Sequence, residues 1–216
     1  MNDILKEIVK IDFAETEYYK DTYTKRQIVL HHTVSNGSAQ AVAAWWSSKP
    51  SHVGTAIVID KEGVIHQLFG SQYYAGHVGS TTKETNSLGL PARNCSKNSI
   101  GVELVNGGGL TMSGTGKLYD AYGHEFRNEN IEHYASGYRG YNYFPKYTEK
   151  QIVSLRRLLL YWSDRYDIPT TYNKDIWDVN AFALTGVSGI YPHTSFRAGK
   201  SDLHPQLELI EMLKSL

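Results

Sequence analysis

The sequence predicts an α/β fold: a single domain with a mixed central β-sheet flanked by helices, carrying a Tyr/Gly-rich insertion. Three observations lead to this prediction. The 216 residues suffice for one domain with a proper core but hardly for two. Hydrophobic residues make up 41% and charged residues 20%, which is typical of a soluble globular protein. Strand and helix patterns follow one another in the order β-α-β-β-β-α-β-α, which favours helices packed on a mixed sheet.

The first part of the chain predicts an arm, a buried strand and a helix. Residues 1–21 form an N-terminal arm that opens with a short helix. Residues 26–32 read R-Q-I-V-L-H-H, a buried-strand pattern that ends in two histidines. Ser38 is a good N-cap for a helix over residues 39–46, and the Lys-Pro-Ser sequence at 49–51 ends that helix.

A hairpin and a further strand follow. Residues 54–60 and 64–69 have strand patterns, and the Lys-Glu-Gly sequence at 61–63 has the length and the glycine of a hairpin turn. Residues 70–98 are mostly loop. Residues 99–105 read S-I-G-V-E-L-V, a strand whose single carboxylate interrupts an otherwise apolar run.

Residues 107–146 form an insertion in which apolar periodicity is lost and Tyr, Gly, Asn and Arg dominate. Its tyrosines either line a glycan or peptide groove or pack over the core, and both interpretations stay open; they include Tyr134, Tyr138, Tyr141 and Tyr143. Trp45 and Trp46 could form a sugar platform, although a tryptophan on the apolar face of a helix is more often a core residue.

The chain then returns to the core. Thr148 and Gln151 have the spacing of a capping box, and they begin a long amphipathic helix that runs to Tyr166. Residues 186–191 form a short strand that leads into a polar loop, and a last helix covers about residues 205–216. We therefore expect an arm at 1–21 and one domain at 22–216 that contains the insertion.

Charge, cysteine content and hydropathy exclude several classes of protein. Lys plus Arg and Asp plus Glu both number 22, so the formal net charge is zero and no nucleic-acid partner is expected. Cys95 is the only cysteine, which excludes an intramolecular disulfide and suits a buried, inert thiol. No stretch resembles a signal peptide or approaches the ~18 apolar residues of a membrane span. We expect a monomer without a membrane span, synthesised into and left in a cytoplasm.

Two histidines and one carboxylate are candidates for a metal site. His31 ends the first buried strand, His193 follows the last short strand, and Asp202 lies in the loop after it. Two imidazoles and a carboxylate form the three-ligand set of a catalytic zinc ion, with a fourth position left for water. Because such ligands commonly come from distant elements, their separation in the sequence is no objection.

The surroundings of these residues resemble the type 2 N-acetylmuramoyl-L-alanine amidases, the family that includes phage amidase-lysozymes and peptidoglycan recognition proteins. The matches occur in the family's order and cover its first zinc-binding strand, central hairpin, substrate-side loop, "N-x-S-I-G-(I/V)-E" strand and closing "K-x-D-P" element. They are, in turn, I-V-L-H-H-T at 28–33, V-G-T-A-I-V-I-D-K-E-G at 53–63, A-G-H at 75–77, N-S-I-G-V-E-L at 98–104 and K-S-D at 200–202.

The resemblance implies roles for single residues. His31, His193 and Asp202 fall on the family's zinc ligands. Glu103 falls on a catalytic carboxylate and Lys200 on a catalytic lysine. The chemistry agrees: zinc would activate water and polarise the carbonyl, Glu103 would move the proton from that water to the leaving amine, and Lys200 would stabilise the developing negative oxygen.

Further positions are assigned by the same resemblance. His77 lies on the substrate-side loop, and Thr55 replaces a catalytic tyrosine of the phage enzymes; both are expected at the substrate. His32 points away from His31 on a strand and is interpreted as structural. Because Leu203 and His204 separate Asp202 from the next proline, His204 is an alternative third ligand.

The predicted function is zinc-dependent hydrolysis of the bond between N-acetylmuramic acid and L-alanine. The substrate is then peptidoglycan or a muropeptide, and the cofactor is Zn²⁺. The leading hypothesis is a phage endolysin that is made in the host cytoplasm and reaches the cell wall after the membrane has been permeabilised. A cytoplasmic amidase that recycles anhydro-muropeptides and a peptidoglycan-binding module without activity are the alternatives.

Overall fold

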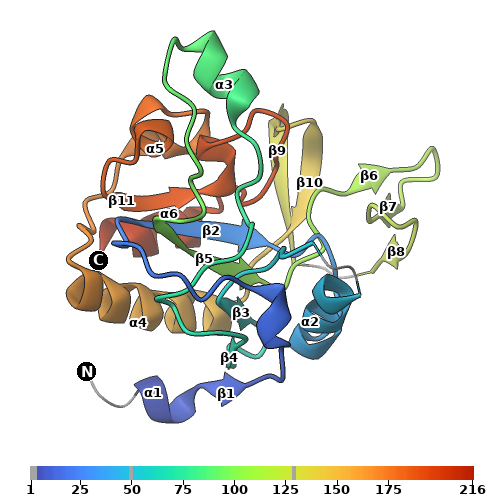
Figure 1. The fold of residues 1–216 in the computed structure, drawn as a ribbon. Coiled ribbons are helices and arrows are strands. Elements are labelled where there is room, and N and C mark those ends of the chain that lie inside the picture. The colour runs from blue at the N-terminus through green and yellow to red at the C-terminus, as the bar shows by residue number, and fades with distance from the viewer. Residues whose placement is uncertain (1–3, 49–50, 128–129) are drawn as a thin grey trace.

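The computed structural model describes residues 4–48, 51–127 and 130–216, and a six-stranded mixed sheet lies at its centre (Figure 1). The strand order is β1-β4-β3-β5-β2-β11. The strands are β1 (Val9–Lys10), β2 (Gln27–His32), β3 (Ile57–Ile59), β4 (Ile65–Gln67), β5 (Ser99–Leu104) and β11 (Gly189–Pro192). The structure therefore confirms the predicted α/β class with a mixed sheet.

The four strands β3, β5, β2 and β11 are parallel neighbours, and β2 and β5 are buried along their whole length. This burial explains why both read as nearly continuous apolar runs. In the register, His31 on β2 pairs with Glu103 on β5, and Pro192 on β11 pairs with Leu30. Parallel strands end at the same edge of a sheet, so the register places the candidate residues at one edge.

Helix α4 (Glu149–Tyr166) packs along one face of the sheet with α1 and α6 against it (Figure 1). The predicted capping box is present: the Thr148 hydroxyl accepts from the Gln151 amide, and the Gln151 side chain accepts from the Thr148 amide. Gln151 also donates to the carbonyls of Ile59 and Val105, which fixes the helix start to the ends of β3 and β5. The other α-helices are α1 (Ile4–Glu7), α2 (Ala39–Ser47), α3 (Thr82–Ser87), α5 (Ala181–Thr185) and α6 (Leu207–Lys214).

The insertion is built from short strands, although its sequence shows no strand periodicity. One part is a three-stranded sheet, and the other is a hairpin that contacts the segment after β11. The elements are β6 (Thr111–Met112), β7 (Leu118–Tyr119), β8 (Glu125–Phe126), β9 (Ile131–Tyr138) and β10 (Tyr141–Pro145). Strands β6 to β9 contain no buried residue, so no core-facing side imposes an alternation of apolar and polar residues on them.

The structure adds elements that the sequence does not predict and changes one boundary. Val9–Lys10 in the arm forms a parallel edge strand, and α3 lies within the stretch at 70–98, which is otherwise mostly loop as predicted. The last strand begins at Gly189 because Gly186, in the left-handed region at φ 83°, ends α5. The predicted stop signal at 49–50 lies outside the described residues. Within the described part of the chain, no helix has the length and apolar character needed to cross a membrane.

Candidate metal and catalytic site

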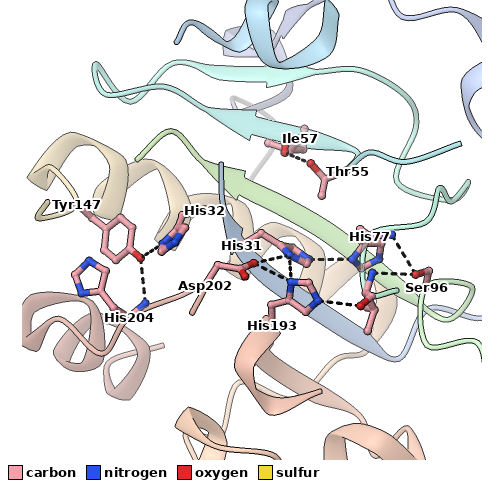
Figure 2. Close-up of polar contacts among 11 residues, drawn as sticks. His31, His32, Thr55, Ile57, His77, Ser96, Tyr147, His193, Asp202 and His204 are labelled. Atoms are coloured by element: carbon pink, nitrogen blue, oxygen red, sulfur yellow. Dashed lines mark hydrogen bonds and ion pairs between the residues drawn. The ribbon is translucent and has the colours of Figure 1, made fainter. Parts of the chain in front are cut away.

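The side chains of His31, His193 and Asp202 meet in a buried group at the edge of the sheet (Figure 2). His31 comes from β2, His193 follows β11 directly, and Asp202 lies in the loop after it. The two Nδ1 atoms are 3.0 Å apart, and Asp202 Oδ2 lies 3.1 Å from His31 Nδ1 and 2.8 Å from His193 Nδ1. Two segments far apart in the sequence, β2 and the stretch from His193 to Asp202, thus bring three possible metal-ligand atoms together.

The backbone determines which nitrogen of His193 carries a proton. His193 Nε2 lies 2.9 Å from the carbonyl oxygen of Val78. A carbonyl can only accept a hydrogen bond, so Nε2 carries the proton and donates it. In the neutral imidazole, Nδ1 then holds a lone pair that points at His31 and Asp202. This second-neighbour contact is the arrangement that orients histidine ligands in metal sites.

A chain of hydrogen bonds fixes the proton of His31 in the same way. The Ser99 hydroxyl donates to the Cys95 carbonyl at 2.7 Å, so its oxygen accepts from His77 Nε2 at 3.0 Å. Burial, followed by the neighbouring imidazoles, lowers the pKa of His77 well below its usual value, which leaves the ring neutral with Nδ1 as an acceptor. His77 Nδ1 then accepts from His31 Nε2 at 3.0 Å (Figure 2). The remaining nitrogen of His31, Nδ1, carries a lone pair.

The charges of the side chains in this group favour the binding of a cation. Burial and the nearby His193 lower the pKa of His31 to about 4, against the opposing effect of Asp202, so His31 is neutral at neutral pH. Burial raises the pKa of Asp202, but its contacts with the two imidazoles outweigh burial and hold the pKa well below 3.8. An ionised carboxylate and two imidazole nitrogens thus lie within 3.1 Å of one another in a buried place, and a cation between them would take all three as ligands. The described residues fit a metal ion.

The group opens into a cavity of about 310 Å³ that the other predicted site residues share. Glu103, Lys200, Thr55 and His77 all line it. The Thr55 hydroxyl donates to the Ile57 carbonyl at 2.9 Å, so its oxygen keeps only its acceptor capacity toward the cavity. Both ring nitrogens of His77 are held within the protein, as described above. Contact of Thr55 and His77 with a substrate stays a prediction.

Glu103 is a buried carboxylate without a hydrogen-bond partner at Oε2. Burial raises the pKa of Glu103 well above 4.5, the charge of Asp202 raises it further, and Lys200 lowers it. An unpaired buried carboxyl group is destabilising by itself. Its place in the cavity, on the strand next to His31, is the environment expected of a group that moves protons in catalysis.

The structure separates His204, the alternative third ligand, from the candidate metal-binding group, and likewise His32, which is interpreted as structural. The His204 ring contacts the Tyr134 hydroxyl at 2.9 Å and the Pro145 carbonyl at 3.1 Å. His32 Nδ1 lies 2.8 Å from the Tyr147 hydroxyl, as expected for the opposite face of β2 (Figure 2). Asp202, not His204, is the residue that the fold brings to the paired imidazoles.

The hairpin β9–β10 of the insertion holds the loop that carries His193 and Asp202. The Tyr138 hydroxyl lies 3.2 Å from both Thr194 Oγ1 and the Leu203 carbonyl. The Arg139 guanidinium donates to the carbonyls of Thr194 and Ala198 at 3.1 and 2.9 Å. Tyr134 packs edge-on against Phe144. For Tyr134 and Tyr138, packing over the core is therefore the correct interpretation.

Sequence reasoning missed Ser99, the Val78 carbonyl, Tyr138 and Arg139. Ser99 belongs to the N-S-I-G-V-E-L motif, so its position was available but its partner was not. A backbone carbonyl has no sequence signal at all. Arg139 is a single arginine in a Tyr-rich stretch, and only the folded hairpin shows which carbonyls it reaches.

Comparison with known proteins supports the same fold. No curated protein matches the chain. Among solved structures, PlyL is 15% identical with a TM-score of 0.55 and covers 96% of this chain and 97% of its own. The PlyG catalytic domain is 16% identical with a TM-score of 0.53, covering 97% and 94%. A mutant endolysin from Bacillus subtilis is 13% identical with a TM-score of 0.52, covering 96% of each chain. At these identities the likeness shows the fold.

The family assignment comes from the sequence match. The model of the family described as N-acetylmuramoyl-L-alanine amidase matches residues 21–205, which is most of the chain and spans every residue of the site. The chain therefore belongs to the N-acetylmuramoyl-L-alanine amidase family.

Proposed function

We propose that this amidase is a zinc enzyme that hydrolyses the bond between the lactyl carbonyl of N-acetylmuramic acid and L-alanine in intact peptidoglycan. One observation carries the proposal: His31, His193 and Asp202 direct two lone pairs and a carboxylate to one point in a cavity that Glu103 and Lys200 also line. Family membership supports the class of bond.

The set of donor atoms favours zinc over other divalent ions. His31 and His193 offer imidazole nitrogens and Asp202 offers a carboxylate oxygen, whereas magnesium and calcium prefer sites made of oxygen alone. The backbone and the chain through His77 orient both imidazoles in advance. A bound zinc ion supplies a Lewis acid that polarises the scissile carbonyl and lowers the pKa of a water molecule.

The residues of this chain then move the protons and hold the charge. In the ionised state that a neighbouring cation favours, Glu103 would accept a proton from the attacking water and deliver it to the nitrogen of L-alanine as the C–N bond breaks. Lys200 places a positive charge in the same cavity and stabilises the negative oxygen that develops on the carbonyl. The products are a free lactyl carboxyl group and a free amine.

We further propose that the enzyme acts as an endolysin. The Bacillus subtilis neighbour is described as an endolysin, and the shared fold supports a similar role for this chain. Such an enzyme would be made in the host cytoplasm and act on the wall after the membrane has been opened. Release of stem peptides from intact sacculi tests this role. An enzyme that cleaves soluble anhydro-muropeptides and leaves sacculi intact would instead be a recycling amidase.

Zinc content tests the metal site. Elemental analysis should find about one zinc per chain in the wild type, and His31→Ala, His193→Ala and Asp202→Ala should each lose it, since each change removes one of three ligands. His204→Ala is the matched control: it removes a buried histidine next to the site and should keep the metal.

Two outcomes would contradict this assignment. Loss of zinc in His204→Ala with retention in Asp202→Ala would mean that His204, and not Asp202, is the third ligand. A wild-type protein that binds no zinc and still releases L-alanine-terminated peptides from muramoyl substrates would remove the metal from the mechanism. Circular dichroism of each variant separates loss of a ligand from loss of the fold.

A further inference from the structure

A second cavity of about 370 Å³ continues the catalytic one. Both cavities are lined by Thr33, Trp45, Trp46, Glu103 and Tyr122. The two cavities therefore meet beside Glu103 and form one groove, and the aromatic side chains of Trp45, Trp46 and Tyr122 line both parts of it. The catalytic steps above use neither the second cavity nor these rings.

Trp45 and Tyr122 line this groove from two separate parts of the fold. Trp45 is 60% exposed on α2, while the adjacent Trp46 is only 8% exposed and belongs to the core. Tyr122 is 64% exposed at the turn between β7 and β8 of the insertion. In Figure 1, α2 and these strands lie on the same side of the molecule. The helix and the insertion together thus present two large rings at one groove.

Hydrogen bonds within the turn fix the backbone that carries Tyr122. The Asp120 side chain is only 5% exposed, and its Oδ1 accepts from the amides of Tyr122 and His124 at 2.9 and 3.0 Å. Gly123 has a φ of 81°, in the left-handed region that favours glycine, and its amide donates to the Asp120 carbonyl at 3.1 Å. An exposed tyrosine on an internally bonded turn is already held in place before a ligand arrives, which lowers the entropic cost of binding.

The chemistry of the second cavity points to an uncharged ligand with a flat apolar face. Among the described residues that line the second cavity, none is basic, and its only charged side chain is Glu103. Lys200 lines the catalytic cavity but not this extension. Stem peptides carry free carboxylates, and the lining of the second cavity offers no basic side chain to pair with them. N-acetylated sugar rings are neutral, and their C–H faces stack on aromatic rings.

We infer that Trp45 and Tyr122 form a clamp for a sugar ring of the glycan strand, which enters from the side of the insertion while the stem peptide leaves toward Lys200. This inference rests on the amidase function proposed above, because that function supplies a substrate with sugar on one side of the scissile bond. The insertion then has a role in recognition through β7 and β8 and a structural role through β9 and β10.

The test uses a sugar that the enzyme cannot cleave. The trisaccharide of N-acetylglucosamine has no stem peptide and no lactyl amide, so its binding does not depend on hydrolysis. Saturation-transfer NMR and calorimetry on the full chain should detect binding to the wild type. Tyr122→Ala and Trp45→Ala should each weaken it by about five- to tenfold, the usual range for one aromatic contact.

Matched variants identify the origin of the effect. Tyr122→Phe keeps the ring and should bind as the wild type does, whereas Tyr122→Leu should behave like Tyr122→Ala. Phe182→Ala removes a ring that is 55% exposed on α5, away from the groove, and should change nothing. Thermal denaturation should show that all these surface variants fold, since none of the three side chains is buried.

Hydrolysis gives an independent measurement. In Tyr122→Ala, KM for a glycan-bearing muropeptide should rise about five- to tenfold with kcat unchanged, since the ring lies outside the reacting atoms. The clamp is wrong if the trisaccharide binds the wild type and both alanine variants equally, does not bind the wild type at all, or is outcompeted by a sugar-free stem peptide. A wild type that binds the trisaccharide through these rings but releases no peptide would keep the clamp and remove the amidase function.

Discussion

Single protons decide whether the imidazoles of His31 and His193 can bind a metal. Each ring has one nitrogen directed at Asp202 and the other held by a hydrogen bond, to the Val78 carbonyl for His193 and to His77 for His31. A ring that carried its proton on Nδ1 would have no lone pair directed at a cation bound next to Asp202. The surrounding protein therefore selects the tautomer before any metal arrives, which reduces the reorganisation that binding requires.

Ser99→Ala tests the hydrogen-bond chain that ends at His31. The change removes the acceptor of the His77 Nε2 proton, so His77 can place its proton on Nδ1, facing the proton of His31. Zinc affinity should fall about tenfold, the low end of the range for outer contacts of metal ligands. Competition with a zinc chelator measures the affinity, and ¹⁵N chemical shifts of the His77 ring report its tautomer.

Ser163→Ala is the matched control for this experiment. Ser163 lies on α4 with a buried hydroxyl that has no hydrogen-bond partner within the described structure. Its loss should leave zinc affinity and the ring shifts unchanged. Equal affinities in Ser99→Ala and the wild type would show that His77 does not act through Ser99.

Glu103→Gln should separate activity from stability. Turnover should fall by roughly 10² to 10⁴, the usual contribution of a positioned acid–base group, while the zinc content stays constant. Burial raises the pKa of Glu103 in the folded state. As the pH rises above the ordinary value of 4.5, the unfolded chain loses this proton and the folded chain keeps it, so the free energy of unfolding of the wild type falls.

Glutamine has no proton to lose, so the variant should not show this decline. The metal-free variant should be more stable than the metal-free wild type at pH 8, and the difference should shrink toward pH 4. Urea denaturation at both pH values measures it. A difference that is constant with pH would mean that Glu103 titrates alike in the folded and unfolded chains.

Among the elements, the hairpin β9–β10 (Ile131–Tyr138 and Tyr141–Pro145) connects the insertion to the site. The loop from His193 to Asp202 has little regular structure beyond one 3-10 turn, so its shape depends on contacts from outside. Tyr138 and Arg139 at the end of β9 provide such contacts through the carbonyls of Thr194, Ala198 and Leu203. The hairpin of the insertion thus helps position two candidate metal ligands, His193 and Asp202.

Arg139→Ala should loosen this loop. The guanidinium is 13% exposed and bonds several carbonyls, so its loss should cost about 1–3 kcal/mol of stability and weaken zinc binding. Thermal denaturation and chelator competition measure the two effects. Arg127→Ala is the control, because Arg127 lies in the same insertion, is 78% exposed and forms an ion pair with nearby Glu125. Equal effects of the two changes would show that Arg139 does not specifically stabilise the loop from His193 to Asp202.

At the scale of the whole molecule, metal binding would be coupled to folding, because the candidate ligands come from β2, from the end of β11 and from the loop beyond it. A metal ion would therefore link distant segments of the chain in the folded state alone. Binding at a hundred times Kd stabilises a protein by about 2.7 kcal/mol. Removing zinc with a chelator should lower the Tm by roughly 5–10 °C for a chain of this size.

The control for this prediction is His31→Ala, whose Tm should not respond to the chelator. Readdition of zinc should restore the wild-type Tm, which separates loss of the metal from damage by the treatment. A wild-type Tm that does not change with chelator would show that the group does not hold a metal under these conditions.

The sequence by itself determined the elements that have strong local signals. The buried runs of β2 and β5, the Ser38 cap of α2 and the capping box of α4 depend on nearest neighbours along the chain, so their patterns were sufficient. The ordered motifs also indicated His31, His193 and Asp202 as partners, and the structure brings their side chains together.

Tertiary structure alone decided the rest. The edge strand β1 and the strand β9 of the insertion contain no buried residue, so burial against the core imposes no alternation that the sequence could show. The roles of Ser99, Val78 and Arg139 depend on backbone carbonyls that come near only when distant segments pack. Every residue type has the same backbone carbonyl, so a hydrogen bond to a carbonyl leaves no pattern in the sequence. Such a contact can be recognised only in the folded structure.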